Sequence, residues 1–236
     1  AYLLHDDPLF WGSVRVTLLY SLVINPLAVA VSLALALLLN RSKWYVGFFR
    51  TLCFLPSAIS LSVVAVIWGV MLDPHFGLAN SVLRMLGLQP QPFLTSSSQA
   101  LWCLMAMSLW RSAGYWMMFF LAGLQGIPQE VYEAAEIDGA GGLTRTFRIT
   151  LPLLARTMSF VLVSNTAFNF LTFAPVFILT RGGPMRSTNM LMYESYKSAF
   201  VNVDLGRATA ISSMLLVVIL ITSVVELRLT RASFEY

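Results

Sequence analysis

Acidic side chains are concentrated in one short stretch of the chain, residues 127–142, and they are the first candidates for chemistry. Glu133, Glu136 and Asp138 could act as a general acid and base, because carboxylates do such work where a pocket shifts their pKa values. The same stretch places no nucleophile, base or metal motif beside them. We therefore interpret these carboxylates as the solvated or docking face of a helix, with an intramembrane enzyme as the alternative.

A second set of polar side chains lies inside apolar stretches. Arg111 is a charge among apolar residues, where it is costly enough that it should face a bundle interior or a water-filled cavity. Asn165, Asn169 and Thr172 recur at intervals of four and three residues, which predicts that they share one helical face. The two polar faces could meet. Alternatively, these groups bond neighbouring helices, or Arg111 reaches toward a membrane interface.

The composition indicates what kind of protein positions these groups. Of the 236 residues, 58% are hydrophobic and 11% are charged, against about 45–50% apolar in soluble domains. This is the composition of an integral membrane protein. The net charge of +4 is scattered rather than clustered, which argues against a nucleic-acid-binding face.

Several other chemistries have no support in the sequence. There is no Gly-x-x-x-x-Gly-Lys-Ser/Thr phosphate loop, so we expect no ATP bound by this chain. His5 and His75 have no partners at metal-ligand spacing. Cys53 and Cys103 lie in apolar stretches at different expected depths, which predicts two small buried side chains and no disulfide.

The apolar stretches predict an all-α, polytopic transmembrane helical bundle. A helix needs about 20 apolar residues to span a bilayer, and five stretches meet this length: Trp11–Asn40, Thr51–Leu72, Ala100–Gln125, Leu153–Thr180 and Leu205–Leu227. Residues 1–10 form a polar lead-in, Pro26 is a point where the first span could kink, and residues 44–50 suit an interfacial turn.

The distribution of basic residues predicts the orientation. The positive-inside rule assigns the basic-rich ends of the spans to the cytoplasm. One side carries Arg41, Lys43, Arg50, Arg145, Arg148, Arg156, Arg228 and Arg231, and the other carries Arg84, Arg181, Arg186 and Lys197. The connectors Asp73–Gln99 and Arg181–Asp204 then face outward, and a short helix over Leu78–Leu88 could lie on the membrane surface. The alternative is that both connectors are exposed loops with no specific function.

The acidic stretch and the residues after it predict a helix, a turn and a second helix, over residues 127–152. Pro128 suits a first helical position, and Gly139 allows a sharp turn. Its charges would each cost roughly 2.5–3.5 kcal/mol in a bilayer core, so this segment lies in water. Small residues at 134 and 135 would permit close approach, and Glu133 could meet a basic partner or be an ordinary surface glutamate.

A resemblance to a known family covers nearly the whole chain. Its central motif is Glu133-Ala134-Ala135, Asp138-Gly139-Ala140, Phe147, Ile149, Leu151 and Pro152, and it is accompanied by Trp110, residues 121–125, Ile127-Pro128, residues 179–184, Tyr196, Ala199-Phe200, Gly206 and Ala210. These residues resemble the EAA loop and flanking segments of the membrane subunits of binding-protein-dependent ABC importers. Within that family they are similar to the carbohydrate and glycerol-3-phosphate branch.

The resemblance implies a single permease domain over residues 1–236, multi-pass in a bacterial plasma (inner) membrane, of the type I importer fold. It implies a half-pore completed by a second permease subunit, two nucleotide-binding ATPase subunits that bind ATP and Mg²⁺, an extracytoplasmic substrate-binding protein, and a further helix before Ala1. The loop residues that it implies for coupling to the ATPase are Glu133, Ala134, Ala135, Asp138 and Gly139.

The resemblance also implies a substrate site. Positions matching Asn165, Asn169 and Thr172 contact sugar in the maltose importer's permease, and those matching Arg111, Ser112 and Tyr115 lie beside the same pocket. Amides and hydroxyls bond sugar hydroxyls, a tyrosine ring can stack on a sugar face, and a guanidinium can hold a phosphate. Arginine at 111 departs from the maltose pattern and favours glycerol-3-phosphate or its diesters, with a neutral sugar or other small polar solute as the alternative.

Overall fold

The computed structural model describes residues 7–41 and 43–230, and all regular structure within these ranges is helical. His5 and Arg231 lie outside them. The α-helices are α2 (Pro8–Leu39), α3 (Val46–Ala58), α4 (Leu61–Met71), α5 (Leu78–Met85), α6 (Ala100–Gln125), α7 (Gln129–Ile137), α8 (Gly142–Arg145), α9 (Leu151–Leu153), α10 (Ala155–Phe170), α11 (Leu191–Tyr196) and α12 (Leu205–Thr230). The 3₁₀ segment η1 (Phe93–Thr95) and the π segments η2 (Thr146–Thr150), η3 (Val176–Thr180) and η4 (Lys197–Val201) complete the fold.

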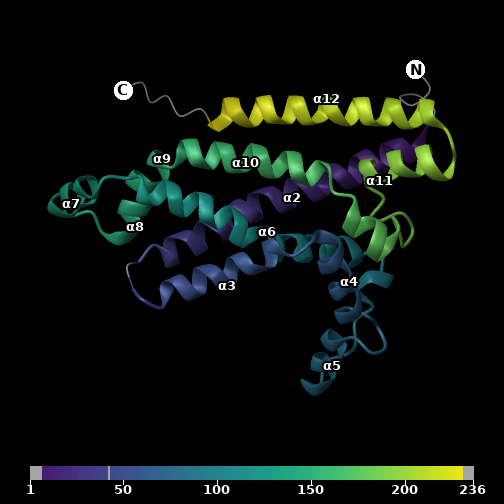
Figure 1. Cartoon of the computed structure of the whole chain (residues 1–236), viewed down its shortest axis with the longest axis horizontal. Helices are drawn as coiled ribbons and strands as arrows, with labels where there is room; N and C mark the ends of the chain where they lie inside the picture. The colour runs from purple at the N-terminus through teal and green to yellow at the C-terminus, as the bar shows by residue number, and fades with distance from the viewer. Residues whose placement is uncertain (1–6, 42, 231–236) are drawn as a thin grey trace.

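The long helices lie side by side along the longest dimension of the molecule (Figure 1). α2 packs against both α6 and α10, and α10 packs against α12. α7 and α8 lie at one end, near the end of α2 and the start of α3, and α11 lies at the other (Figure 1).

Within the described ranges, two helices are long and apolar enough to cross a membrane alone, α2 and α12. Two bent helix pairs pass the same length and composition criteria when each pair is taken together: α3 with α4 (96°) and residues 142–153 with α10 (68°). α6 has 26 residues but is less apolar, since it carries Arg111 and three tryptophans. The predicted spans over residues 51–72 and 153–180 are not single continuous helices, because the first is interrupted at residues 59–60 and α10 ends at Phe170.

The two interruptions differ in their distance from a proline. Pro56 lies near the end of α3 and has no N–H to donate, and the chain leaves helical geometry at Ile59 and Ser60. α10 ends at Phe170, five residues before Pro175.

α2 begins earlier than predicted, at Pro8, because Asp7 caps it. The Oδ1 atom of Asp7 accepts hydrogen bonds from the backbone N–H groups of Leu9 (3.0 Å) and Phe10 (3.2 Å), and Pro8 needs no partner at the first helical position. The helix continues through Pro26 without a break.

Three smaller boundaries also differ. α3 begins at Val46, so the predicted interfacial turn over residues 44–50 shortens to residues 44–45. The short helix predicted over residues 78–88 is confirmed as α5, which ends at Met85. The second helix of the polar segment is divided into α8, η2 and α9, and it leads directly into α10.

Glycines allow α6 to approach its neighbours closely. A Cβ on Gly114 would overlap the backbone carbonyl of Cys53 in α3. A Cβ on Gly123 would lie 2.7 Å from the Thr157 hydroxyl oxygen and 2.8 Å from Leu154. Close backbone contact at small residues is how helices associate in lipid, where burial of apolar surface drives little association. Cys53 and Cys103 are free thiols.

Candidate functional site

A buried network of polar side chains connects the long helices, and Asn25 of α2 is its centre. Its Oδ1 atom accepts from the amides of Asn165 (3.0 Å) and Asn169 (2.6 Å), both on α10. Its Nδ2 atom donates to the hydroxyls of Thr166 (2.7 Å) and Ser21 (3.1 Å). Asn25 thus uses all of its hydrogen-bonding capacity inside the bundle. We call this set, with the residues below, the asparagine network.

Two residues lie at the ends of this network. On α6, the indole Nε1–H of Trp116 donates to Oδ1 of Asn165 over 2.8 Å. On α12, the Oε1 atom of Glu226 accepts from the Thr166 hydroxyl over 2.7 Å. The Oε2 atom of Glu226 is buried and accepts no hydrogen bond from the described residues. The network therefore crosses from α6 through α10 and α2 to α12.

The predicted polar face of residues 165, 169 and 172 is present only in part. Asn165 and Asn169 lie one turn apart on α10, as predicted, and both are buried. Thr172 lies beyond the end of α10, so the prediction that it shares this helical face was wrong. It is nevertheless buried, and it lies beside the hydroxyl of Tyr20, which donates to Ser108 over 2.7 Å.

The predicted residues of α6 lie apart from this network. One guanidinium nitrogen of Arg111, Nη2, lies 3.5 Å from the carbonyl oxygen of Ser57, where α3 is about to end and its last carbonyls lack helical partners. The Nε atom of Arg111 is buried and has no partner among the described residues. Most donors of this guanidinium are therefore available to another group.

Tyr115 of α6 contacts the asparagine network through Trp116. Its ring contacts Trp116 edge-on, with centroids 4.9 Å apart, and Trp116 in turn bonds Asn165. The Tyr115 side chain itself is exposed, and Ser112 is half-buried. Among the described residues, no hydrogen bond joins Arg111 or Ser112 to the asparagine network.

The turn of the polar segment has the geometry that requires glycine. Gly139 has φ +77°, in the left-handed region that L residues rarely adopt. Its N–H donates to the carbonyl of Glu136 (3.0 Å), and the next N–H, of Ala140, donates to the carbonyl of Ala135 (2.9 Å). These two bonds satisfy carbonyls at the end of α7, as helix-ending glycines commonly do.

The outward surface of this segment, the coupling loop, combines acidic and apolar groups. Glu133, Ala134 and Asp138 are exposed, while Ala135 is buried within the chain. Glu133 accepts a hydrogen bond from Gln129 of the same helix over 2.8 Å. The loop also exposes three large apolar side chains, Ile137, Leu143 and Phe147.

Tyr132 holds the two halves of the coupling loop together. The Thr150 hydroxyl lies 3.4 Å from the Tyr132 hydroxyl, and the Arg145 guanidinium lies 5.9 Å from the Tyr132 ring centroid. Both partners come from the second half of the loop, which leads into α10. Tyr132 therefore connects α7 to the segment that leads into α10, the helix that carries Asn165 and Asn169.

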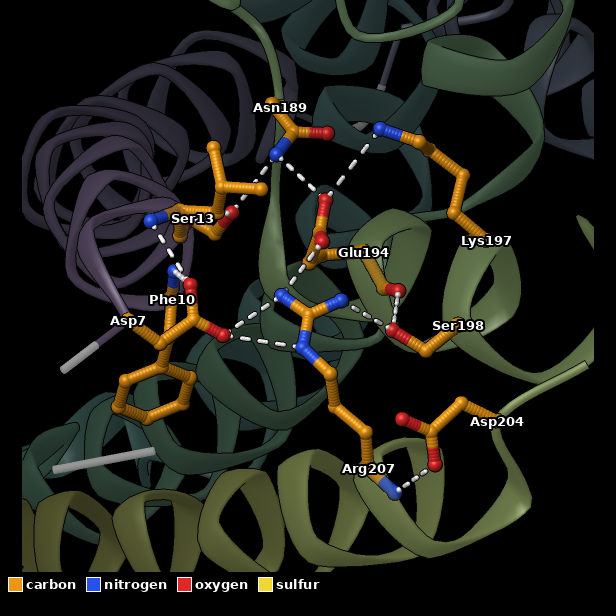
Figure 2. Close-up of polar contacts among 10 residues, drawn as sticks. Asp7, Phe10, Ser13, Asn189, Glu194, Lys197, Ser198, Asp204 and Arg207 are labelled. Carbon is orange, nitrogen blue, oxygen red and sulfur yellow. Dashed lines mark hydrogen bonds and ion pairs between the residues drawn. The ribbon is translucent and has the colours of Figure 1, made fainter. Parts of the chain in front are cut away.

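A buried cluster of charges lies at the opposite end of the bundle, where the start of α2 meets α11 and α12 (Figures 1 and 2). The Arg207 guanidinium of α12 lies 2.8 Å from Asp7 and 2.9 Å from Glu194 of α11, and it donates to the Ser198 hydroxyl over 2.7 Å. Lys197 lies 3.5 Å from Glu194. We call these residues the Arg207 cluster.

Glu194 is ionised by this environment. Burial raises its pKa, but hydrogen bonds from Asn189 and Arg207, together with the charges of Lys197 and Arg207, outweigh burial and hold the pKa of Glu194 below its ordinary value. Figure 2 shows the Asn189 amide between this carboxylate and the Ser13 hydroxyl of α2.

Sequence reasoning missed Asn25, Thr166, Glu226 and the Arg207 cluster. Glu226 carried a signal, since it is the one acidic residue in α12 and an ionisable group inside a span is a functional candidate. Arg207 carried the same signal at the start of α12. The assignment of Glu194 to a connector hid its pairing with Arg207, which lies 13 positions later at the start of α12.

Comparison with protein families gives a match over most of the chain. The family described as "Binding-protein-dependent transport system inner membrane component" matches residues 27–232. The sn-glycerol-3-phosphate transport system permease protein UgpA of Agrobacterium fabrum is 35% identical over 232 residues, covering 98% of this chain and 79% of the relative. The protein of the same description from Yersinia pestis is 34% identical over 234 residues, covering 99% of this chain and 79% of the relative.

Two solved structures share the fold. A chain in the crystal structure of a bacterial alginate ABC transporter, in complex with an alginate pentasaccharide-bound periplasmic protein, superimposes with a TM-score of 0.87 at 25% identity over 96% of this chain and 80% of that one. A chain of a bacterial ABC transporter involved in the import of the acidic polysaccharide alginate gives 0.89 at 25% identity over 98% and 82%.

Proposed function

The chain belongs to the binding-protein-dependent transport system inner membrane component family, so it is an ABC importer permease and not an enzyme, and we propose that it forms half of the translocation path for a glycerol-3-phosphate-type solute. The solute would be small, hydroxylated and anionic. Hydroxyl groups suit the amides of α10, and an anionic group suits the guanidinium of Arg111.

The observation that carries this proposal is the state of Arg111. Its Nε is buried without a partner in the described chain, and Nη2 reaches only a carbonyl oxygen at 3.5 Å. A buried charge in a span is costly unless it is compensated, so such a group is expected to serve a ligand or a partner. Phosphate and carboxylate both match its planar fork. The names of the relatives support an anionic solute, since they refer to sn-glycerol-3-phosphate and to an acidic polysaccharide.

We propose the working assembly that the family pattern implies. A second permease subunit would complete the path, two ATPase subunits would bind ATP and Mg²⁺, and an extracytoplasmic binding protein would deliver the solute. The chain would cross the membrane several times, with the coupling loop in the cytoplasm and the connectors at residues 73–99 and 181–204 outside. The exposed acidic and apolar groups of the coupling loop support a docking role toward the ATPase.

Reconstituted importer, containing the cognate partner subunits and binding protein, tests the substrate class. ATPase stimulation and uptake are measured with sn-glycerol-3-phosphate, a glycerophosphodiester, glycerol and maltose. We expect stimulation by the anionic solutes. Loss of a charge-assisted hydrogen bond in Arg111→Gln should raise the half-saturating concentration of the anionic solute about tenfold or more.

Asn169→Ala supplies the second arm of this experiment. It should impair transport of any hydroxylated solute, whereas Arg111→Gln should affect a neutral one much less. Stimulation by maltose alone, with Arg111→Gln unaffected, would replace the anionic solute by a neutral sugar. Normal transport by both variants would place the site elsewhere in the path.

A further inference from the structure

The hydrogen bonds of the asparagine network all run in one direction. Trp116 donates to Asn165, Asn165 donates to Asn25, Asn25 donates to Thr166, and Thr166 donates to Glu226. The first member, an indole N–H, can only donate. At the other end, the Oε1 atom of Glu226 accepts from the Thr166 hydroxyl. The chain of donors therefore runs from α6 to α12 and ends at Glu226.

The two ends determine how each amide is turned. The N–H of Trp116 requires the oxygen of Asn165 to face it, which leaves the Asn165 amino group to face Asn25. The oxygen of Asn25 must then face α10, and its amino group must face Thr166. Thr166 can accept from Asn25 because its own hydrogen is engaged by Glu226.

This order determines which atom of Asn169 remains available. Its amino group donates to Asn25 over 2.6 Å. Its carbonyl oxygen accepts no hydrogen bond from the described residues, and this oxygen is not fully buried. Asn169 therefore offers an acceptor, which is the group that a hydroxyl of a bound solute can donate to.

We propose that Glu226 is a positioning residue for substrate recognition, which acts through Thr166 and Asn25 to keep the Asn169 carbonyl oxygen turned toward the solute. The proposal rests on the function proposed above. Glu226 does not touch the solute. Its carboxyl group accepts the hydrogen bond that the Thr166 hydroxyl donates. Without that acceptor, the Thr166 hydroxyl hydrogen can point at Asn25.

Loss of the acceptor would allow a different arrangement of amides. If Thr166 donates to Asn25, the Asn25 amide turns, and its amino group then faces α10. Asn169 must turn in response, because two amino groups cannot bond each other. Asn169 would then present N–H groups where the solute needs an acceptor. Asn165, which Trp116 prevents from turning, would lose its bond to Asn25.

The test uses the reconstituted importer and compares Glu226→Leu with Glu226→Gln. Glutamine keeps an oxygen that can accept from Thr166, whereas leucine does not. Glu226→Leu should raise the half-saturating solute concentration for ATPase stimulation about three- to tenfold, the worth of one neutral hydrogen bond, with the maximal rate within about twofold. Glu226→Gln should remain near the unaltered protein.

Two more variants keep the test decisive. Thr166→Val removes the hydroxyl between Asn25 and Glu226, and it should raise the half-saturating concentration as Glu226→Leu does. It tests the proposal independently if Glu226→Leu does not assemble. Ser159→Ala is the matched control, because the Ser159 hydroxyl joins α10 to the carbonyl of Thr230 in α12 (3.3 Å) but lies outside the network. It should leave the half-saturating concentration unchanged.

Each outcome decides between the two proposals. Raised half-saturation in Glu226→Leu and Thr166→Val, with recovery in Glu226→Gln, supports the positioning role. If both variants have a normal half-saturating concentration while Asn169→Ala is impaired, the positioning role is wrong and the proposed path remains. Normal values in all three overturn the path and the role together. An equal defect in Glu226→Gln and Glu226→Leu overturns the positioning role, because an oxygen that accepts from Thr166 would then not be enough to maintain solute recognition.

Discussion

Arg207 lies 2.8 Å from Asp7, although the two residues are 200 positions apart in the chain. Asp7 caps α2 with one carboxylate oxygen and holds Arg207 of α12 with the other. Glu194 of α11 binds the same guanidinium, so three helices meet at one buried charge (Figure 2).

Removal of Arg207 should destabilise this end of the bundle strongly. Arg207→Met leaves the buried carboxylate of Asp7 without its cation and leaves Glu194 with Lys197 alone, and breaking a buried ion pair typically costs about 3–5 kcal/mol. Unfolding of the detergent-purified protein measures the loss. Arg84→Met, at an exposed arginine of α5, is the control and should change stability by less than about 0.5 kcal/mol. Equal unfolding midpoints for the two variants would contradict a structural role for the cluster.

The same cluster predicts how stability depends on pH. Because the native pKa of Glu194 is lowered, the unfolded chain binds more protons in acid than the native chain does. The contribution of Glu194 is complete above the ordinary glutamate pKa of about 4.3 and is lost as the pH falls through the lower native value. Unfolding midpoints measured across this window should fall less steeply for Glu194→Gln. Identical slopes would show that Glu194 is not the responsible group.

Gly139 should be sensitive to any side chain. Gly139→Val forces a β-branched residue into φ +77°, at a cost of about 1–2 kcal/mol, and should distort the turn of the coupling loop. The variant should insert in the membrane and lose most substrate-stimulated ATPase activity of the importer. Gly141→Ala is the matched control, since Gly141 lies in the same turn with φ −63° and open space around it. Equal activity of the two variants would exclude a special role for the left-handed position.

Charge reversal tests the docking role of Glu133. Glu133→Lys should weaken association with the ATPase subunits at least about tenfold, because a like charge would face the basic partner. Glu136→Lys reverses a charge of the same type at another exposed position of α7 and should have a smaller effect. Co-purification of the ATPase measures both. If Glu136→Lys is the more harmful change, the contact lies on the other face of the helix.

Accessibility of single cysteines tests the proposed topology. After Cys53 and Cys103 are replaced by alanine, cysteines are placed at Ser97, Met185 and Thr144, which are all exposed. A membrane-impermeant reagent applied to intact cells should label the first two positions and spare Thr144. Labelling of Thr144 alone would reverse the orientation of the whole chain.

The sequence alone was sufficient for features that depend on near neighbours. Apolar stretches predict membrane-embedded helices because the cost of burying a charge in lipid applies residue by residue. The turn at Gly139 and the short helix α5 also follow from local signals. The family motif in the coupling loop was equally readable, because its residues are contiguous.

Helix breaks were only partly readable. Pro56 and Pro175 were visible in the sequence, but Pro26 shows that a proline inside a span does not always end the helix. Whether the freed carbonyls find partners decides the outcome. At the end of α3 the Ser57 carbonyl receives Arg111 from another helix, a contact that no local pattern predicts.

Tertiary structure alone decided which polar groups meet. Asn25 and Asn165 are 140 residues apart, and their bond depends on how α2 packs against α10. In a bilayer interior each buried donor and acceptor must find a partner within the protein, but the sequence does not state which one. The predicted face of α10 was therefore correct for Asn165 and Asn169, while its partners, and the role of Glu226 as the last acceptor, became visible only when the helices were packed together.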